Sequence, residues 1–232
     1  MTDPEIIIYG GTFDPPHRGH IDCMKNVIQR FPGALVVIVP GLRPAGVYGK
    51  HKDPLLNFET RFELCRLAFV VDANFKNVEL SSIEQRLPIP NYTLNTINKI
   101  QEKYSNKRIA IILGLDQFQG FCGWNEPSQI LRCSDLILIN RGKDSGSRLK
   151  EEVETQIDKL GHKINWFDQE LAFIDETSTK IFLIGVETSI ASSSEIRNYL
   201  SEEKKVPEGW LSPSVECQII SNRLYLAKGK EE

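Results

Sequence analysis

Two histidines that follow a glycine pair near the start of the chain have the types and spacing of a phosphate-binding turn. The segment from Gly10 to His20 reads Gly-Gly-Thr-Phe-Asp-Pro-Pro-His-Arg-Gly-His. Glycines let a backbone approach a phosphate and adopt conformations closed to other residues. A turn that opens a helix also presents N–H groups and a positive dipole end to an anion. His17 and His20 share one helix face at this spacing, so both could donate hydrogen bonds to one polyphosphate.

Two other interpretations of this turn stay open at this point. Glycine, proline and aspartate are common in ordinary turns. Histidines three residues apart could also bind a metal ion, although no third ligand lies nearby in the sequence. Within the turn, Asp14 is expected to organise the backbone rather than to touch a nucleotide.

A second segment, from Ala191 to Arg197, reads Ala-Ser-Ser-Ser-Glu-Ile-Arg and precedes a predicted helix. Ser192 and Glu195 have the spacing of a capping box, so local structure alone could explain them. A helix start with three hydroxyls and an arginine could equally bind a phosphate. On that interpretation the hydroxyls and Arg197 contact the anion.

The rest of the chain alternates short apolar runs with helical patterns, as in an α/β protein. Strands are expected over Glu5–Tyr9, Ala34–Val39, Asn77–Leu80, Ile109–Leu113, Leu136–Asn140 and Ile181–Gly185. Helices are expected over Gly19–Arg30, Phe58–Val70, Thr93–Tyr104, Pro127–Arg132 and Ser193–Leu200. This order predicts a doubly wound, Rossmann-like and mostly parallel sheet with helices on both faces. We expect a single domain over residues 1–232, with a helical C-terminal part over about 192–226.

The composition narrows the classes of protein to consider. The 232 residues are 41% hydrophobic and 25% charged, which is typical of a globular domain. A net charge of -3 argues against a broad nucleic-acid surface, and no apolar stretch approaches the ~18 residues of a membrane span. Five cysteines without a Cys-x-x-Cys pair predict free buried thiols and a reducing cytoplasm. We therefore expect a cytoplasmic protein that binds neither nucleic acid nor membrane.

Both phosphate segments resemble motifs of the nucleotidylyltransferase superfamily. The first is similar to its Thr/Ser-Phe-Asp-x-x-His-x-Gly-His motif, and the second to its Ile-Ser-Ser-Thr-x-Ile-Arg motif. The resemblance implies that His17, His20 and Arg197 are catalytic, because they bind the ATP phosphates and stabilise charge on the phosphoryl group under attack. The implied ATP site comprises Gly10, Gly11, Thr12, Phe13, Gly19, His20, Gly114, Asp116, Ser193, Ser194 and Arg197. Mg²⁺ is expected to arrive with ATP, without a dedicated protein metal site.

Three internal segments resemble bacterial nicotinate-nucleotide adenylyltransferases in particular. They are Asn91–Thr96 (Asn-Tyr-Thr-Leu-Asn-Thr), Gly114–Trp124 (Gly-Leu-Asp-Gln-Phe-Gln-Gly-Phe-Cys-Gly-Trp) and the strand Leu136–Arg141. The resemblance extends from Ile6 to about Leu226. It implies that nicotinate mononucleotide attacks the α-phosphorus of ATP, which gives nicotinate adenine dinucleotide and pyrophosphate in NAD biosynthesis.

The implied acceptor site combines an aromatic face with backbone N–H groups. Trp124 could stack on a pyridinium ring with a cation–π contribution, or it could be an ordinary core tryptophan. The turns at Thr93, Leu94 and Asn125 could hold a carboxylate through their N–H groups. Asp116 suits a hydrogen bond to a ribose, or a helix cap.

Two departures from the family pattern affect this acceptor site. Arg43-Pro44-Ala45-Gly46 stands where the family has Pro-Pro-His-Lys. Arg43 and Lys52 are therefore the candidate cations for the acceptor's phosphate, although the register of the basic segment 41–54 stays open. Asn95 replaces the motif's aspartate, which affects a structural hydrogen bond rather than the reaction.

Three alternatives remain at this point. The acceptor could be the amide, nicotinamide mononucleotide, or another phosphate such as phosphopantetheine, although those enzymes are shorter and lack the Trp124 segment. The chain could also be a non-catalytic nucleotide-sensing module. Acid-versus-amide selectivity, kinetic constants and oligomeric state, including a homodimer, are not determined by the sequence.

Overall fold

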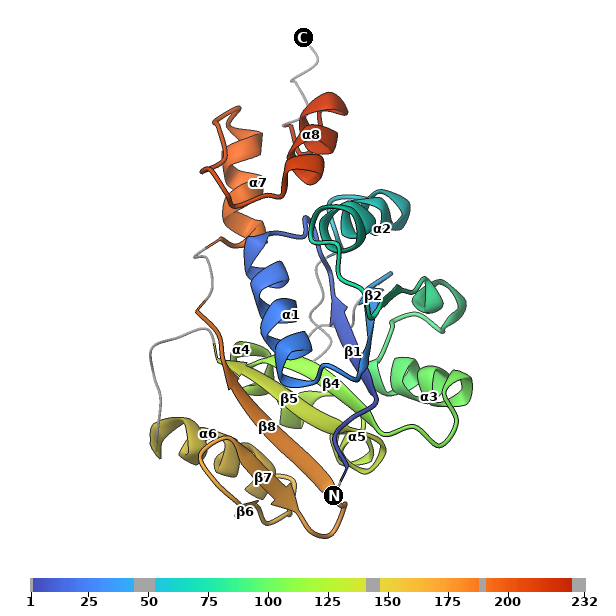
Figure 1. Cartoon of the computed structure of the whole chain (residues 1–232), viewed down its shortest axis with the longest axis vertical. Helices are drawn as coiled ribbons and strands as arrows, with labels where there is room; N and C mark the ends of the chain where they lie inside the picture. Colours follow the sequence, from blue (N-terminus) through green and yellow to red (C-terminus); the bar gives the residue numbers. More distant parts are fainter. Residues whose placement is uncertain (1, 44–52, 141–146, 188–190, 227–232) are drawn as a thin grey trace.

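A mostly parallel sheet runs through the centre of the computed structural model, which describes residues 2–43, 53–140, 147–187 and 191–226 (Figure 1). Within these residues the strand order is β3-β2-β1-β4-β5-β8-β7-β6. The strands are β1 (Ile6–Gly11), β2 (Leu35–Pro40), β3 (Val78–Leu80), β4 (Ile109–Gly114), β5 (Asp135–Asn140), β6 (Asn165–Trp166), β7 (Leu171–Ile174) and β8 (Thr179–Gly185).

The chain winds outward in two directions from the middle of the sheet. It runs from β1 to β2 and β3 on one side, and then from β4 to β5 and β8 on the other, always in parallel pairing. The predicted doubly wound α/β fold is therefore confirmed. The switch in direction falls between β1 and β4, which is where ligands bind in open sheets of this type.

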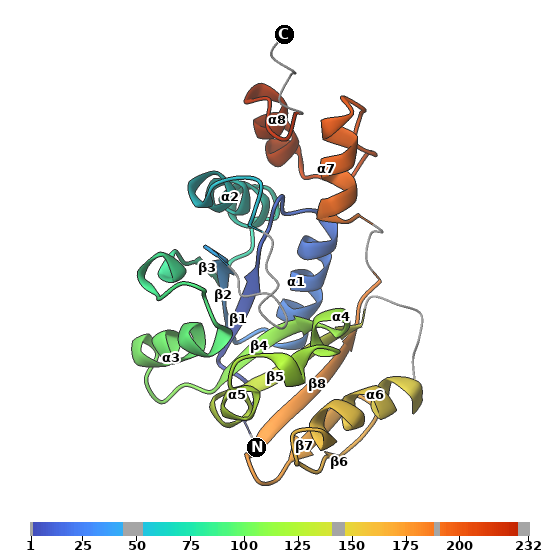
Figure 2. The same cartoon turned by 180° about the vertical axis from the view of Figure 1, so that it is seen from behind.

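Helices cover both faces of the sheet, as Figures 1 and 2 show. The longer elements are α1 (Arg18–Arg30), α2 (Phe58–Cys65) with a π-helical continuation (Arg66–Asp72), α3 (Thr93–Lys103), α5 (Pro127–Cys133), α6 (Ser147–Asp158), α7 (Ser193–Ser201) and α8 (Pro213–Ser221). Shorter turns are α4 (Leu115–Phe118) and two 3₁₀ segments, Ile83–Arg86 and Phe121–Gly123.

The alternation of side chains in β1 divides the core into two layers. Ile7 and Tyr9 pack with α1, α2, α7 and α8, whereas Ile6 and Ile8 pack with α3, α5 and α6. A strand that is buried on both faces must be apolar throughout, which explains why continuous apolar runs predicted the parallel strands. Helices α7 and α8 lie at one end of the molecule, next to the start of α1 (Figure 1).

Some elements were not predicted. Helix α6 and the antiparallel strands β6 and β7 lie in a segment where no element was expected. Strands of two and four residues are too short to show a period in the sequence. The helix predicted over Phe58–Val70 exists, but it becomes π-helical at Arg66. Residues 44–52, 141–146 and 227–232, for which polar connections and a tail were expected, lie outside the described residues.

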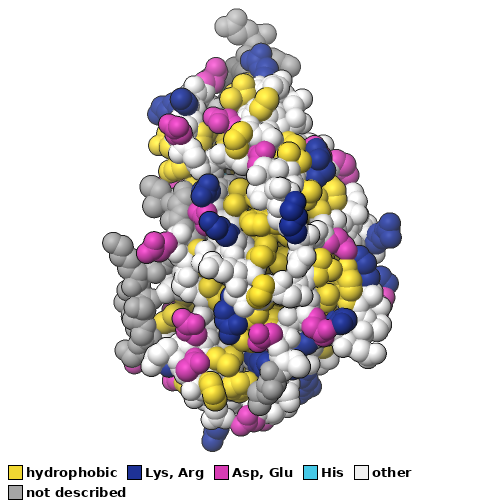
Figure 3. All heavy atoms as spheres, in the orientation of Figure 1, with side chains coloured by type: hydrophobic (Ala, Val, Ile, Leu, Met, Phe, Trp, Pro, Cys, Tyr) yellow, Lys and Arg dark blue, Asp and Glu magenta, His cyan; other side chains and the backbone are white. Residues whose placement is uncertain are grey.

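The cysteines are free, although not all are buried. Cys23 and Cys65 are buried, Cys122 and Cys133 are half-buried, and Cys217 is exposed. The prediction of five buried thiols is wrong for Cys217, because helix α8 turns Val215 and Ile219 toward the core and Cys217 away from it. No helix among the described residues combines the length and apolar composition needed to cross a membrane. On the face shown in Figure 3, cationic and anionic side chains are interspersed.

Candidate active site

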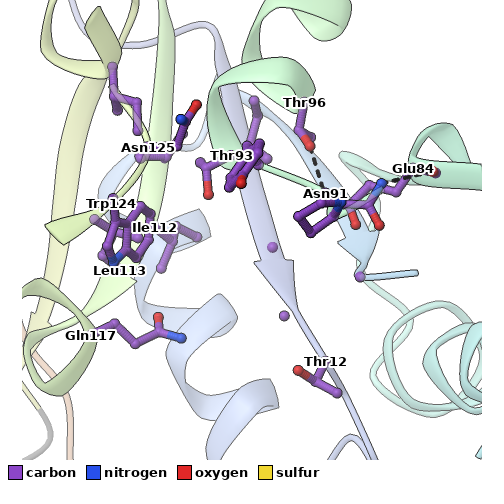
Figure 4. A pocket seen from close by; sticks show the side chains of 18 of the residues that line it. Thr12, Glu84, Asn91, Thr93, Thr96, Ile112, Leu113, Gln117, Trp124 and Asn125 are labelled. Carbon is purple, nitrogen blue, oxygen red and sulfur yellow. Dashed lines mark hydrogen bonds between the residues drawn. The ribbon is translucent and has the colours of Figure 1, made fainter. Parts of the chain in front are cut away.

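A cavity of about 500 Å³ lies at the switch point between β1 and β4. Its volume is in the usual range for a small-molecule site. Figure 4 shows Trp124 and Asn125 on one side of it and Glu84 and Asn91 on the other. The lining residues are Ile8, Gly10, Gly11, Thr12, Gly41, Glu84, Pro90, Asn91, Tyr92, Thr93, Thr96, Ile111, Ile112, Leu113, Gln117, Gly123, Trp124, Asn125 and Ile130.

The segment 10–20, here named the phosphate turn, leads from β1 into α1. His17 is the N-cap of α1, and its Nδ1 accepts a hydrogen bond from the Gly19 N–H at 3.1 Å. The His17 N–H in turn donates to Nδ1 of His20 at 3.2 Å. The two rings lie 3.8 Å apart between centroids. Because each Nδ1 is an acceptor, these hydrogen bonds assign the ring proton of each neutral imidazole to Nε2.

The expectation that Gly10 and Gly11 adopt backbone conformations closed to other residues is wrong. Gly10 and Gly11 belong to β1 and do not adopt the left-handed conformation, which falls instead on Phe13 with φ 49°. A Cβ on Gly11 would lie 2.8 Å from Cζ of Phe13. Gly11 therefore makes room for the Phe13 ring, which is 2% exposed and packs edge-on against Tyr9 and Phe69.

Asp14 organises the phosphate turn, as expected from the sequence. Its carboxylate is buried and accepts two hydrogen bonds of 2.7 Å, from the Leu55 N–H and the Tyr225 hydroxyl. These partners come from the segment before α2 and from the end of the described chain. Burial and the neighbouring Asp14 carboxylate raise the pKa of Tyr225, so the phenol stays protonated and donates.

The second predicted phosphate segment docks directly on this turn. The Ser193 hydroxyl donates to the Pro15 carbonyl at 2.9 Å, and Nη1 of Arg197 donates to the Asp14 carbonyl at 2.7 Å. Nη2 of Arg197 also donates to the Ser194 hydroxyl at 3.3 Å. The structure therefore brings together two motifs that lie about 180 residues apart in sequence, at the N-termini of α1 and α7.

The capping interpretation of this second segment also holds. Ser192 is the N-cap of α7, and its hydroxyl accepts from the Glu195 N–H at 3.2 Å. The cap and the contacts of the phosphate turn use different serines, so the two interpretations do not exclude each other. Ala191 is buried, in agreement with a packing role.

Trp124 forms part of the opposite wall of the cavity. It is half-buried and packs against Phe121, with the ring centroids 5.5 Å apart. Asn125 and Thr93 also line the cavity. Thr93 opens helix α3, whose cap residue Tyr92 makes no side-chain hydrogen bond to the first turn. The N-terminus of this helix therefore directs N–H groups toward the cavity region.

Of the predicted site residues, those that line the cavity are Gly10, Gly11, Thr12, Thr93, Trp124 and Asn125. The other predicted residues within the described part of the chain, which include His17, His20 and Arg197, do not line it. Asp116 is exposed on α4, where Gly114 is the N-cap, and Gln117 lines the cavity in its place. Leu94 packs against the apolar layer. Arg43 is exposed and forms a two-point ion pair with Asp53, at 2.9 and 3.1 Å. This carboxylate raises the pKa of Arg43. Lys52 lies outside the described residues.

Three polar residues that sequence reasoning did not select hold the site together. Arg61 is 1% exposed and donates to three backbone carbonyls, those of Thr12, Leu42 and Leu56. Its place on the apolar stripe of α2 was a usable signal, because a charge among buried helix positions needs partners.

Glu84 and Asn91 are the other two, and both line the cavity. Oε1 of Glu84 accepts from the Thr96 hydroxyl and Oε2 from the Leu42 N–H, both at 3.0 Å. Burial raises the pKa of Glu84. Asn91 accepts from the Arg43 N–H at 2.8 Å and donates to the Glu84 carbonyl at 3.1 Å. Asn91 opens the segment Asn91–Thr96 that resembles the family, but no site role was predicted for it. No periodic pattern in the sequence distinguishes Glu84 from an ordinary loop residue.

Comparisons with known proteins show the family of this chain. The cytidylyltransferase-like family model matches residues 8–199. A protein of Dictyoglomus thermophilum named "probable nicotinate-nucleotide adenylyltransferase" is 30% identical over 96% of this chain and 100% of its own length. A protein of Aquifex aeolicus with the same name is 29% identical over 75% of this chain and 99% of its own.

A solved structure shares the fold. The nicotinic acid mononucleotide adenylyltransferase of Plasmodium falciparum complexed with NaAD superposes with a TM-score of 0.67 at 19% identity, over 96% of this chain and 98% of that one. Taken with the sequence matches, the chain belongs to the cytidylyltransferase-like family and, within it, to the nicotinate-nucleotide adenylyltransferases.

Proposed function

We propose that this protein transfers the AMP moiety of ATP to nicotinate mononucleotide, which gives nicotinate adenine dinucleotide and pyrophosphate. The observation that carries the proposal is the meeting of two helix N-termini, those of α1 and α7, beside a cavity of about 500 Å³ at the switch point of the sheet. Residues 1–232 act as one domain in this proposal. The free cysteines are in keeping with a cytoplasmic enzyme.

The ATP half of the site consists of the phosphate turn and the start of α7. The triphosphate of Mg·ATP binds at the N-termini of α1 and α7, where helix dipoles favour an anion. Nε2–H groups of His17 and His20 donate to phosphate oxygens, and Arg197, Ser193 and Ser194 complete the cradle. Bound Mg²⁺ travels with the substrate and neutralises charge on the pyrophosphate.

The adenosine of ATP extends from this cradle along the carboxyl ends of β1 and β4. Gly10, Gly11, Gly19 and the backbones of Thr12 and Phe13 supply close contacts on the β1 side. Gly114 and Asp116 do so on the β4 side, where Asp116 reaches the ribose from its exposed position on α4.

The acceptor half of the site consists of Trp124, Asn125 and the start of α3. The pyridinium ring stacks on Trp124, which contributes roughly 1–2 kcal/mol. The nicotinate carboxylate is held by N–H groups at Thr93, Leu94 and Asn125. Such donors pair with a carboxylate and leave a carboxamide NH₂ without an acceptor, at a cost of roughly 1–3 kcal/mol.

Cations for the acceptor's 5′-phosphate come from the basic segment after β2. Arg43 leaves Asp53 to bind this phosphate, and Lys52 adds a second charge. The Arg43–Asp53 pair is exposed, and solvent screens exposed ion pairs, so Arg43 can leave Asp53 at little cost.

Chemistry in this site needs no covalent intermediate. An oxygen of the acceptor's 5′-phosphate attacks the α-phosphorus of ATP, the new P–O bond forms, and the bond to pyrophosphate breaks. A phosphate oxygen is already ionised, so no general base is required. Catalysis comes from alignment and from cationic stabilisation of charge on the transferred group.

ATP radiolabelled at its α-phosphorus tests the proposal. With nicotinate mononucleotide, the label must appear in a dinucleotide that co-migrates with nicotinate adenine dinucleotide. Label in free AMP alone, or in no product, would reject the reaction.

A further inference from the structure

Arg61 is a fully buried cation that belongs to neither half of the site and touches both. It lies on α2 and donates from three different nitrogens: Nη1 to the Thr12 carbonyl at 2.7 Å, Nε to the Leu56 carbonyl at 3.1 Å, and Nη2 to the Leu42 carbonyl at 3.4 Å. The guanidinium therefore uses its planar fork to hold three backbone groups in fixed directions.

Two of those carbonyls mark the ends of adjacent strands. Thr12 follows β1 and is part of the phosphate turn, and Leu42 follows β2, where the basic segment starts. The strand ends are themselves joined by a hydrogen bond of 2.8 Å from the Gly41 N–H to the Gly11 carbonyl. Arg61 thus fixes the spacing between the ATP half and the entrance to the acceptor half.

Two buried carboxylates, Asp14 and Glu84, act electrostatically on Arg61. Burial lowers the pKa of Arg61, whereas the charges of Asp14 and Glu84 act to raise it. Asp14 belongs to the phosphate turn, and Glu84 lines the cavity and holds the Leu42 N–H and the Thr96 hydroxyl. The Leu42 carbonyl therefore accepts a hydrogen bond from Nη2 of the Arg61 cation. The Leu42 N–H donates to Oε2 of the Glu84 carboxylate.

We propose that Arg61 is a positioning residue that couples the ATP half to the acceptor half, and that Glu84 is its partner on the acceptor side. The part of this inference that concerns the acceptor rests on the proposed function. Arg61 touches no substrate and is not a catalytic residue. It acts by keeping the Thr12 and Leu42 backbones at the separation that the phosphate under attack and the attacking phosphate require, and small errors in such alignment are costly in rate.

The contacts predict different effects on substrate binding for substitutions of Arg61 and of Glu84. Arg61 holds both halves, so Arg61→Lys, which keeps the charge and loses the fork, weakens ATP binding and raises KM for nicotinate mononucleotide. Each change is expected at ~10-fold or more, the usual consequence of losing a charge-assisted hydrogen bond. Glu84 holds only the acceptor side, so Glu84→Gln raises the acceptor KM ~5-fold or more and leaves the Kd of ATP within about twofold.

The experiment combines calorimetric titration of Mg·ATP without acceptor and steady-state kinetics with nicotinate mononucleotide. The control is Arg66→Lys, because Arg66 lies one turn further along, is exposed and pairs only with Glu63 among the described residues. It should behave as the wild type in both assays. Circular dichroism and Tm report whether each variant is folded.

Every result bears on the inference. If Arg61→Lys is folded and keeps both the ATP Kd and the acceptor KM within twofold, the positioning role is wrong. If Arg61→Lys does not fold, Glu84→Gln tests the inference. Equal changes in the ATP Kd and the acceptor KM, or no change in either, would show that Glu84 does not act on the acceptor side alone and would overturn the inference. If the wild type binds ATP but forms no dinucleotide, the proposed function fails. The calorimetric titration of Mg·ATP still tests whether Arg61 positions the ATP half.

Discussion

The proposed ATP half and the proposed acceptor half of the site are built in different ways. In the ATP half, side chains from distant parts of the chain are already joined: Arg197 and Ser193 contact the phosphate turn, and Tyr225 bonds to Asp14. In the proposed acceptor half, Trp124, Asn125 and Thr93 line the cavity, and Arg43 is paired with Asp53. On the proposed function, the reacting phosphates bind where side chains are already joined, whereas the choice of acceptor depends on backbone N–H groups and on the Arg43–Asp53 ion pair.

Removing a donor from the ATP half should have the largest effect. His20→Ala is expected to lower kcat by at least ~10², because a preorganised donor to the reacting phosphoryl group is lost. The fold should persist, since His20 is only half-buried. Steady-state kinetics with a circular dichroism spectrum measures both. His162→Ala, a histidine away from the site, is the control, and a near wild-type kcat for His20→Ala would remove His20 from the mechanism.

Removing the aromatic wall tests the acceptor half separately. Trp124→Ala should raise KM for nicotinate mononucleotide by ~5- to 30-fold, the equivalent of a cation–π contact of roughly 1–2 kcal/mol. The KM of ATP should stay near its wild-type value, and Trp124→Phe should restore most of the binding. An equal rise in both KM values would mean that Trp124 is a core residue rather than an acceptor contact.

A smaller effect is expected at Tyr225, whose hydroxyl donates to Asp14 of the phosphate turn. Tyr225→Phe removes a partly buried hydrogen bond of 2.7 Å to Asp14. A hydrogen bond to a charged group contributes about 1.5–3 kcal/mol, so Tm should fall by several degrees and kcat severalfold. Tyr104→Phe is the matched control, since it loses a bond of 2.6 Å to Glu79 far from the site. If both variants lower Tm alone, Tyr225 supports the fold and not the turn.

Breaking the Arg43–Asp53 ion pair should have the smallest effect on kinetics. This effect should also depend most strongly on salt. Asp53→Ala frees Arg43, so KM for nicotinate mononucleotide should fall about two- to threefold at low ionic strength and less in high salt. Arg43→Gln should raise the same KM. A rise for both variants would show that Asp53 holds Arg43 in its working position rather than competing for it.

The sequence predicted features that have a local pattern and missed features that depend on contacts between distant residues. The parallel strands are buried on both faces and therefore read as apolar runs, and the motif around His17 to His20 marks a helix start. The family and the fold predicted in this way are confirmed by the comparisons. Strands β6 and β7 were missed because they are too short to show a period.

Contacts within the site were predictable only where they were local. The bond from Tyr225 to Asp14 spans 211 residues and leaves no pattern in the sequence. The left-handed residue of the turn is Phe13 rather than a glycine, because tertiary packing of its ring determines the backbone there. Arg61 was the exception, since its burial could have been inferred from its helical position.

The most direct test of the account is pyrophosphate release from Mg·ATP by the wild-type protein, with nicotinate mononucleotide and its amide in parallel. The account predicts rapid release with the acid and a value of kcat/KM lower by ~10-fold or more with the amide, because backbone N–H groups leave a carboxamide NH₂ without an acceptor. Equal rates with the two acceptors would contradict the backbone-based choice of acceptor. Release with neither, despite ATP binding, would contradict the proposed reaction itself.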